Sequence, residues 1–215
     1  MSPVSHHIPE DIIEAYASGA LPHGFSVVVA THLSLCDSCR AVAEACDALG
    51  GVALESLGAE AAGMTPDRAL REKTLALLDA PRAVPEDPKP MGIFPAAVAA
   101  ELGAKGPAWR SIGAGIRQQI LVDGREGSAR LLSIPGGKAV PDHGHNGLEM
   151  TLVLQGSFHD VTGRYARGDV QVVTDDLEHT PTADPGPDCI CLAATDAPLR
   201  FSAMIPRLLQ RYFRI

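Results

Sequence analysis

The sequence predicts a two-domain protein of the α + β class, in which a helical domain precedes an antiparallel β-sandwich or β-barrel. Three observations lead to this prediction. The first 80 residues carry apolar side chains at helical spacing, residues 81–90 hold four prolines, and strand-like runs separated by Gly, Pro and Asp turns follow. We therefore place a helical domain at 1–80, a Pro-rich linker at 81–92 and a β-domain at 93–215.

Four helices are expected in the first domain, because prolines, glycines and an acidic N-cap bound four amphipathic stretches. The predicted ranges are 8–20, 26–33, 37 to the Gly50-Gly51 pair, and 65–80. The stretch after Gly51, rich in Ala and Gly, is expected to be weakly helical at best. These helices contain few large apolar side chains, and so small a domain usually needs a staple such as a structural metal.

His32, Cys36 and Cys39 form the most informative motif of this domain, spaced His-x3-Cys-x2-Cys. Zn²⁺ prefers such nitrogen and sulfur ligands, usually four of them in a tetrahedron. On one continuous helix the three side chains share a face, and a short break between Leu35 and Cys39 would also bring the thiolates together. The alternative is that both cysteines are small buried hydrophobes and the histidine is an ordinary helix residue.

A tetrahedral site needs a fourth ligand, and the candidates are His6, His7 and His23. His6 and His7 stand just ahead of the first predicted helix, where a ligand would tie that helix to the metal. His23 is expected in a turn and more exposed to solvent. Cys46 is expected to be a core residue. Spacing and chemistry alone do not separate His6 from His7.

The β-domain is expected to begin with a short helical segment at 94–102 and to end with a helix at 205–212. Between them, β-branched and apolar runs predict antiparallel strands that form a sandwich or barrel. The predicted strands are 116–122, 129–134, 149–154, 169–173, 189–194 and 200–203.

A second set of metal-ligating residues lies among these strands. His143, His145 and Glu149 share odd parity, so on an extended strand their side chains face one side. His179, after a later turn, is placed to complete the set. Three imidazoles and a carboxylate suit Zn, Fe, Mn, Ni or Cu. The alternative is a polar barrel mouth with solvated histidines.

The charge is unevenly divided. Residues 1–80 carry four basic and eleven acidic side chains, a formal −7, whereas the remainder carries fourteen basic and fifteen acidic ones. An acidic first third disfavours direct nucleic-acid binding and suits a basic protein partner, although simple solubility explains it as well. We expect no export signal, because the N-terminus shows no basic stretch followed by an apolar core. No apolar run is long enough for a membrane span, and five cysteines suit a reducing compartment. We expect a cytoplasmic protein.

The pattern Gly137-x5-His143-Gly144-His145-x3-Glu149-x6-Gly156 resembles the first cupin motif, and His179 stands where the second motif places its histidine. The usual Pro-x-Gly before that histidine and the Asn after it are missing. Cupins are jelly-roll β-barrels with a metal inside. Together with the histidine–cysteine motif and the linker, the whole chain resembles the ChrR-like anti-sigma factors, in which a zinc-binding anti-sigma domain precedes a cupin.

The resemblance implies that His7 is the fourth zinc ligand and that the cupin site also holds zinc, with Fe, Mn or Ni as alternatives. It implies no enzymatic activity. The helical domain would bind an extracytoplasmic-function sigma factor in a one-to-one complex, and the cupin would mediate release when singlet oxygen or a related oxidative stress appears. The alternative function is a metal-dependent, dioxygenase-like cupin enzyme with a zinc-stapled helical appendage.

Cys189 and Cys191 lie two residues apart on a predicted strand and therefore face one side. They are either a redox-active pair or, more commonly for this spacing, packed small residues.

Overall fold

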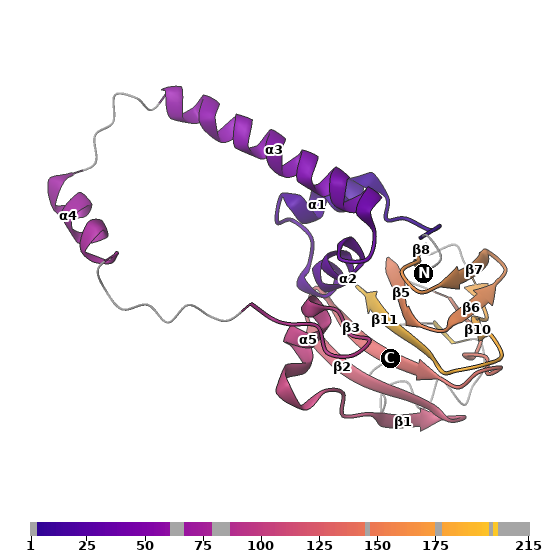
Figure 1. The fold of residues 1–215 in the computed structure, drawn as a ribbon. Coiled ribbons are helices and arrows are strands. Elements are labelled where there is room, and N and C mark those ends of the chain that lie inside the picture. The colour runs from indigo at the N-terminus through magenta and orange to yellow at the C-terminus, as the bar shows by residue number, and fades with distance from the viewer. Residues whose placement is uncertain are drawn as a thin grey trace. The chain divides into compact units, whose positions relative to one another are not determined.

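The computed structural model describes residues 4–60, 67–78, 87–144, 147–174, 178–197 and 200–201. The chain divides into two compact units, one made of Met1–Ala43 with Pro88–Ile215 and the other of Glu44–Asp87. Figure 1 shows the order of the elements along the chain. The helices are α1 (Glu10–Ala17), α2 (His23–Leu33), α3 (Asp37–Glu60), α4 (Arg68–Ala76), α5 (Ala96–Leu102) and the short 3₁₀ helix η1 (Gly103–Lys105).

The first unit contains the strands, and all pairings among the described strands are antiparallel. The strand order is β1-β2-β3-β11-β5-β8 in a six-stranded sheet, and β10-β6-β7 and β12-β4-β9 in two three-stranded sheets. The predicted α + β class with a C-terminal β-barrel domain is confirmed. The strands are β1 (Arg110–Gly113), β2 (Ile116–Gly124), β3 (Gly127–Ile134), β4 (His143–Gly144), β5 (Glu149–Gln155), β6 (Ser157–Asp160), β7 (Gly163–Ala166), β8 (Val170–Val173), β9 (Glu178–His179), β10 (Thr182–Ala183), β11 (Cys189–Thr195) and β12 (Arg200–Phe201).

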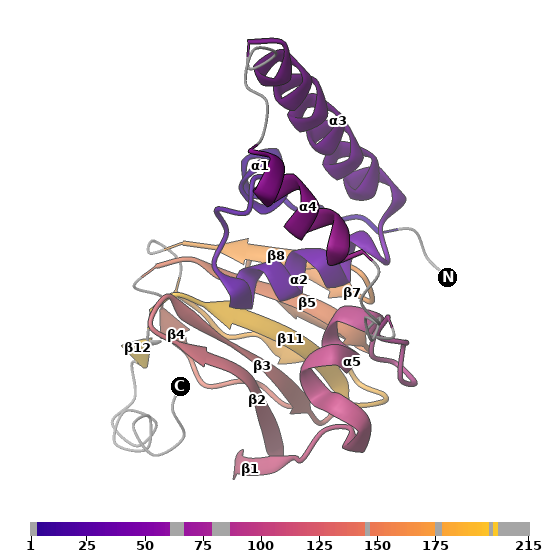
Figure 2. The same cartoon turned by 90° about the vertical axis from the view of Figure 1, so that its left-hand side faces the viewer.

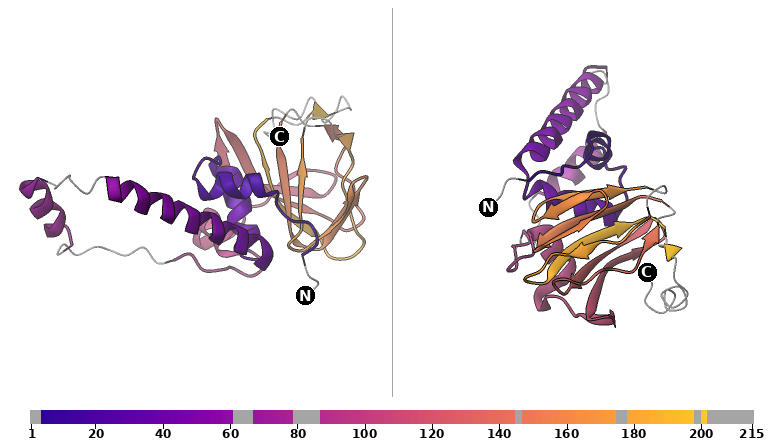
Figure 3. Two further views of the ribbon diagram at one scale, coloured as in Figure 1. Left: turned by 90° about the horizontal axis from the view of Figure 1, so that it is seen from above. Right: turned by 90° about the vertical axis from the view of Figure 1, so that its right-hand side faces the viewer.

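Helix α2 packs directly on one face of the six-stranded sheet. It contacts β3, β5 and β11, and α5 lies beside it on the same face (Figure 2). From the opposite side the strands lie in front of these helices (Figure 3, right). Leu131, Leu192 and Leu152 stand opposite one another on β3, β11 and β5, and all three are fully buried in a cluster that includes Val28 of α2. A helix that is apolar on most sides is expected to be buried in this way.

The other face of the sheet points into the barrel. Because side chains alternate along a strand, Leu152 faces α2 whereas its neighbour Val153 joins a second cluster with Phe158, Tyr165 and Cys191. Both faces of β5 are therefore buried. The inward face of β5 also carries Glu149.

The seam between α2 and the sheet requires a close backbone approach. A Cβ atom on Gly24, near the start of α2, would lie 3.3 Å from the backbone carbon of Ser128 on β3. The absence of a side chain at Gly24 therefore allows the first turn of α2 to lie directly on the backbone of β3. The sequence did not predict this seam, since the same apolar residues would equally pack against other helices.

Helix α3 continues through the Gly50-Gly51 pair to Glu60, so the predicted end at those glycines is wrong. Each interior glycine costs a helix about 1 kcal/mol relative to alanine, and the many Ala, Leu and Glu residues around the pair outweigh this cost. In the second unit, α4 begins after Asp67, whose side chain accepts from the Ala69 N–H. The large apolar side chains of this unit are exposed, namely Leu49, Val52, Leu54, Leu57, Leu70, Leu75, Leu77 and Leu78.

Five predicted strands correspond to β2, β3, β5, β8 and β11, and α5 corresponds to the predicted segment 94–102. The short strands β1, β4, β6, β7, β9 and β10 were not predicted. The predicted strand 200–203 is described only at Arg200–Phe201, and the closing helix 205–212 and residues 81–86 of the linker lie outside the described residues. The compact units divide the chain differently from the domains placed at 1–80 and 93–215, because residues 1–43 belong with the β-sheets.

Asp184 joins β6, β7 and the segment after β10 on the surface of the first unit. Its carboxylate accepts from Ser157 Oγ at 2.5 Å and Arg164 Nε at 2.7 Å, and lies 2.8 Å from His159 Nδ1. The Ser157 hydrogen bond, opposed by burial and aided by Arg164 and His159, lowers the pKa of Asp184 to about 2.

We expect Asp184→Asn to remove a pH-dependent part of the stability. An unfolded aspartate has a pKa of about 3.9, so this contribution is complete above about pH 5 and is lost as the pH falls toward 2. The difference in unfolding free energy between wild type and variant should therefore shrink below about pH 4. Urea unfolding across a pH series measures it, and a difference that stays constant with pH would contradict the assignment.

Candidate metal centres

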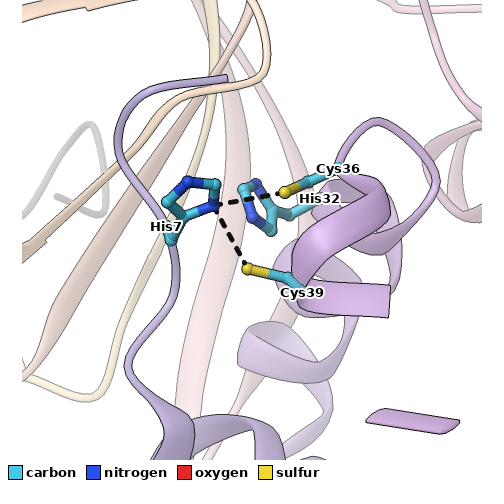
Figure 4. Close-up of side chains that lie close together, drawn as sticks. All are labelled: His7, His32, Cys36 and Cys39. Carbon is cyan, nitrogen blue, oxygen red and sulfur yellow. Dashed lines mark hydrogen bonds between the residues drawn. The ribbon is translucent and has the colours of Figure 1, made fainter. Parts of the chain in front are cut away.

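Four side chains converge where the N-terminal segment meets the α2–α3 turn. His32 lies on the last turn of α2, Cys36 in the break between helices, Cys39 in the first turn of α3, and His7 in the extended segment before α1. Figure 4 shows them pointing toward one another. The helix is thus interrupted at residues 34–36, and the thiolates converge through this break rather than along one continuous helix.

The spacing of this cluster fits a tetrahedral metal. One ligand atom from each residue lies within 4.8 Å of all the others. His7 Nδ1 is 3.2 Å from Cys36 Sγ and 3.5 Å from Cys39 Sγ. Zinc bonds of about 2.0–2.3 Å place tetrahedral ligand atoms about 3.3–3.8 Å apart. His32 Nε2 is buried without a hydrogen-bond partner, which is the situation of a nitrogen that faces a metal.

A hydrogen bond and burial favour the form of the His32 ring that can bind a metal through Nε2. Its Nδ1 donates to the Gly168 carbonyl at 2.9 Å, so the proton is on Nδ1 and Nε2 keeps its lone pair. Burial lowers the pKa of His32, opposed by the Gly168 hydrogen bond and assisted by His7, so the ring is neutral. Burial also raises the pKa of the Cys39 thiol. Binding of a metal cation would then release protons from the cysteines, and metal affinity would rise with pH.

The structure separates His7 from the other fourth-ligand candidates. The His6 ring packs against Tyr165 with ring centres 4.3 Å apart, and its Nδ1 lies 3.6 Å from an oxygen of Asp169. His23 starts α2 and contacts Glu101 at 3.0 Å. His7 alone among these three belongs to the cluster in the described residues. Cys46 is half-buried on α3.

A second cluster lies inside the barrel and consists of His143, Glu149 and His179, all buried. His143 and His179 are directly paired between β4 and β9, and their ring centres lie 4.7 Å apart. His143 Nδ1 donates to the Pro141 carbonyl at 2.8 Å, while Glu149 accepts from Thr151 Oγ1 at 2.9 Å. His145, predicted as a further ligand, lies outside the described residues.

The carboxylate of Asp160 contacts the Nδ1 atom of the His179 ring. Its Oδ2 lies 2.6 Å from His179 Nδ1, and both side chains are fully buried. Burial alone would raise the pKa of Asp160, but hydrogen bonds from Thr162, Gln171 and His179 lower it to about 2. A carboxylate on one ring nitrogen orients the other toward a metal and increases its basicity. The donor set and its supports fit a divalent metal of the zinc or iron kind.

Several supporting residues were not predicted from the sequence. Asp160 begins the segment Asp-Val-Thr-Gly, a typical turn sequence, and one of its oxygens does accept from the Thr162 N–H as in an Asx turn. Only the fold shows that the other oxygen meets His179. Gly168 and Asp169 gave no signal either, because the N-terminal groups that they bind, at Ser5 and His32, lie more than a hundred residues away in the chain.

Cys189 and Cys191 face the apolar interior of the barrel. Both are free and buried, and their sulfurs are 3.5 Å apart. The Cys189 contact and burial raise the pKa of Cys191 well above its ordinary value. A protonated, buried thiol is a poor nucleophile, so the geometry favours packed residues over a thiolate-based redox pair.

Comparison with known proteins decides the family. Residues 103–198 match a family model described as the ChrR cupin-like domain. The chain is 50% identical, over 99% of both chains, to the anti-sigma-E factor ChrR of Cereibacter sphaeroides. The chain belongs to the ChrR family of anti-sigma factors. A crystal structure of Rhodobacter sphaeroides SigE in complex with the anti-sigma ChrR matches with a TM-score of 0.71 and 50% identity, covering 90% of this chain and 99% of that one.

The resemblance to ChrR-like proteins inferred from the sequence is thus confirmed. Among the helices that the structure describes, none is long and apolar enough to cross a membrane. The two metal-ligand clusters lie in the same compact unit.

Proposed function

We propose that this chain is an anti-sigma factor that binds an extracytoplasmic-function sigma factor in a one-to-one complex and blocks its contact with RNA polymerase. The observation that carries the proposal is the 50% identity to ChrR over 99% of both chains, together with the likeness to ChrR in a complex with SigE. The protein would act in the cytoplasm, where RNA polymerase works, and would not contact nucleic acid directly. Its acidic first 80 residues suit a basic protein surface.

The exposed apolar side chains of α3 and α4 support a protein-binding role for the second unit. Leu49, Val52 and Leu57 on α3 are more than 60% exposed, as are Leu77 and Leu78 just after α4. Soluble proteins rarely leave so many large apolar groups in water unless a partner covers them. Helix α1 offers less apolar surface to a partner, because its Ile13 is fully buried in the core of the first unit.

We further propose zinc for both clusters. Two thiolates and two imidazoles are the set that structural zinc prefers, and the unpartnered Nε2 of buried His32 supports a bound cation there. In the barrel the proposed ligands are His143, His145, Glu149 and His179. Four protein ligands close a tetrahedron and leave no open position, which suits a structural or sensing role rather than catalysis.

The barrel would act as the sensor. We propose singlet oxygen or a related oxidative stress as the signal, on the strength of the family resemblance. Imidazoles and thiols are oxidisable, and the barrel interior holds His143, His179, Cys189 and Cys191. Damage to the barrel site would then weaken the hold on the sigma factor.

Co-expression tests the partner assignment. The untagged chain, produced beside tagged sigma factors of the same genome, should co-elute with one extracytoplasmic-function member at equal stoichiometry. Illumination with a photosensitiser should release that sigma factor from the wild type. A His179→Ala variant, whose barrel site is already altered, should hold the sigma factor less tightly in the dark and show less light-dependent release. Absence of co-elution with every such sigma factor would overturn the proposal. Release that is equal in both proteins would overturn the sensor role alone.

Elemental analysis tests the metals and the enzymatic alternative. We expect about two zinc ions per chain in protein made without added metal, and no turnover. Iron in the barrel with oxygen consumption would favour a dioxygenase instead, because that chemistry requires a redox metal with open positions.

A further inference from the structure

A four-residue segment, Gly168–Gln171, bonds to His32 of the N-terminal cluster and to Asp160, which in turn contacts His179 of the barrel cluster. It comprises the end of the turn after β7 and the first residues of β8. Because successive side chains on a strand point to opposite faces, this segment reaches the N-terminal segment on one side and the barrel interior on the other. Val170 belongs to the cluster under α2, whereas Gln171 bonds to Asp160 inside the barrel.

On the outer side, the segment bonds to His32 directly and to the backbone just before His7. The Gly168 carbonyl accepts from His32 Nδ1 at 2.9 Å. The Asp169 carboxylate accepts from the backbone N–H groups of Ser5 at 2.7 Å and His6 at 3.0 Å. The Val170 N–H donates to the His6 carbonyl at 3.1 Å. The peptide unit that joins His6 to His7 is therefore hydrogen-bonded to the start of β8, which restrains the backbone at His7.

The fit at Gly168 is close. Its φ is +94°, and a Cβ atom there would lie 2.8 Å from Val4 Cγ2. Only glycine accepts both the left-handed conformation and the approach of the N-terminal segment. Asp169 is 3% exposed and also accepts from the Ala166 N–H at 2.9 Å, which fixes the carboxylate within the turn.

On the inner side, the segment reaches the barrel cluster through one hydrogen bond. Gln171 Nε2 donates to Asp160 Oδ2 at 2.7 Å, and the same oxygen lies 2.6 Å from His179 Nδ1. Gln171 is 3% exposed and stands opposite Thr151 on β5, two residues from Glu149. Displacement of His179 would therefore remove one partner of the buried Asp160 carboxylate and leave its charge to the hydrogen bonds from Gln171 and Thr162.

We propose that Gly168–Gln171 positions both metal centres at once, so that a change at the barrel centre alters metal retention at the centre formed by His7, His32, Cys36 and Cys39. Asp169 and Gln171 are the positioning residues. The segment is thereby a route from the barrel to the N-terminal helices, and its role in sigma release rests on the proposed function. Outer-shell partners of metal ligands typically change metal affinity about 10–100-fold.

The test uses the full chain loaded with Co²⁺. Thiolate-to-cobalt charge-transfer absorption reports the Cys36–Cys39 centre specifically, because the described barrel ligands include no thiol. The rate at which a chelator removes this signal is compared among wild type, Asp169→Asn, Asp160→Asn and Gln171→Met. Gln171→Met keeps the side-chain length and removes the donor, which makes it the mildest change.

We expect Asp169→Asn to accelerate cobalt loss about 10–100-fold. Gln171→Met and Asp160→Asn should accelerate it at least about threefold, although neither residue contacts the N-terminal cluster, and either change combined with Asp169→Asn should be less than additive. Asp184→Asn is the matched control, since it removes a carboxylate that accepts similar hydrogen bonds from Ser157 and Arg164. It should release cobalt at the wild-type rate.

Two results would overturn the proposal. Wild-type rates in both Gln171→Met and Asp160→Asn would show that the barrel does not influence the N-terminal centre. Equal acceleration in Asp184→Asn would show a general loss of stability instead. No sigma factor is present in this assay, so failure of the link leaves the anti-sigma proposal intact, and failure of co-elution leaves the cobalt result intact.

Discussion

Replacing both Cys36 and Cys39 with serine is expected to remove one metal ion per chain and to abolish co-elution with the sigma factor. Two of the four ligand atoms are lost, and a serine hydroxyl is a poor ligand for zinc. Structural zinc contributes an apparent 10–16 kcal/mol, roughly, in small zinc-binding peptides, which is comparable with the whole stability of a domain. Metal content and co-elution measure the two effects directly.

The damage should be local to the N-terminal segment and the start of α3. Leu131, Leu152 and Leu192 in the core of the sheet stand on β3, β5 and β11, none of which carries a ligand of this centre. Hydrogen exchange should therefore rise at residues 4–43 and stay slow in β5 and β11. Cys46→Ser is the matched control, because Cys46 lies outside both clusters. Retention of wild-type metal content by the double variant would contradict the assignment of this centre.

Strands were predicted correctly from the sequence where the residue types themselves favour a buried strand. β5 and β11 are long runs of apolar and β-branched residues, and their predicted ranges differ from the observed ones by one residue. By contrast β6 and β7 are four residues long and rich in polar groups, and they form a hairpin around the turn at Asp160. Short polar strands lack the alternation on which such predictions depend.

The metal-ligand clusters also contain a part that the sequence predicts and a part that it does not. Histidines and cysteines at metal spacing identify candidate ligands from the sequence, whereas the supports of those ligands depend on the fold. The Gly168 carbonyl is a backbone atom and lies 136 positions from His32 in the chain. The packing of α2 on the sheet was equally hidden, because Phe25 and Val28 would suit the interior of a helical bundle as well.

Leu152→Ala is expected to loosen the helices from the sheet, and Val153→Ala is its matched control on the same strand. Both side chains are fully buried, but Leu152 packs in the cluster with α2 whereas Val153 faces the barrel interior. A buried Leu→Ala change costs about 2–5 kcal/mol, and we expect about 1.5–3 kcal/mol for Val→Ala. Urea unfolding measures both values.

The two variants are expected to differ more in which residues lose protection from hydrogen exchange than in how much unfolding free energy they lose. In Leu152→Ala, exchange should rise in α2 at residues 27–33, and cobalt should leave the Cys36–Cys39 centre faster, because His32 lies on the last turn of that helix. In Val153→Ala, exchange should rise around Phe158 and Cys191 while α2 stays protected. Cobalt loss from Leu152→Ala at the wild-type rate would mean that the sheet does not hold the N-terminal centre through α2. The seam would then be a packing contact without influence on the metal.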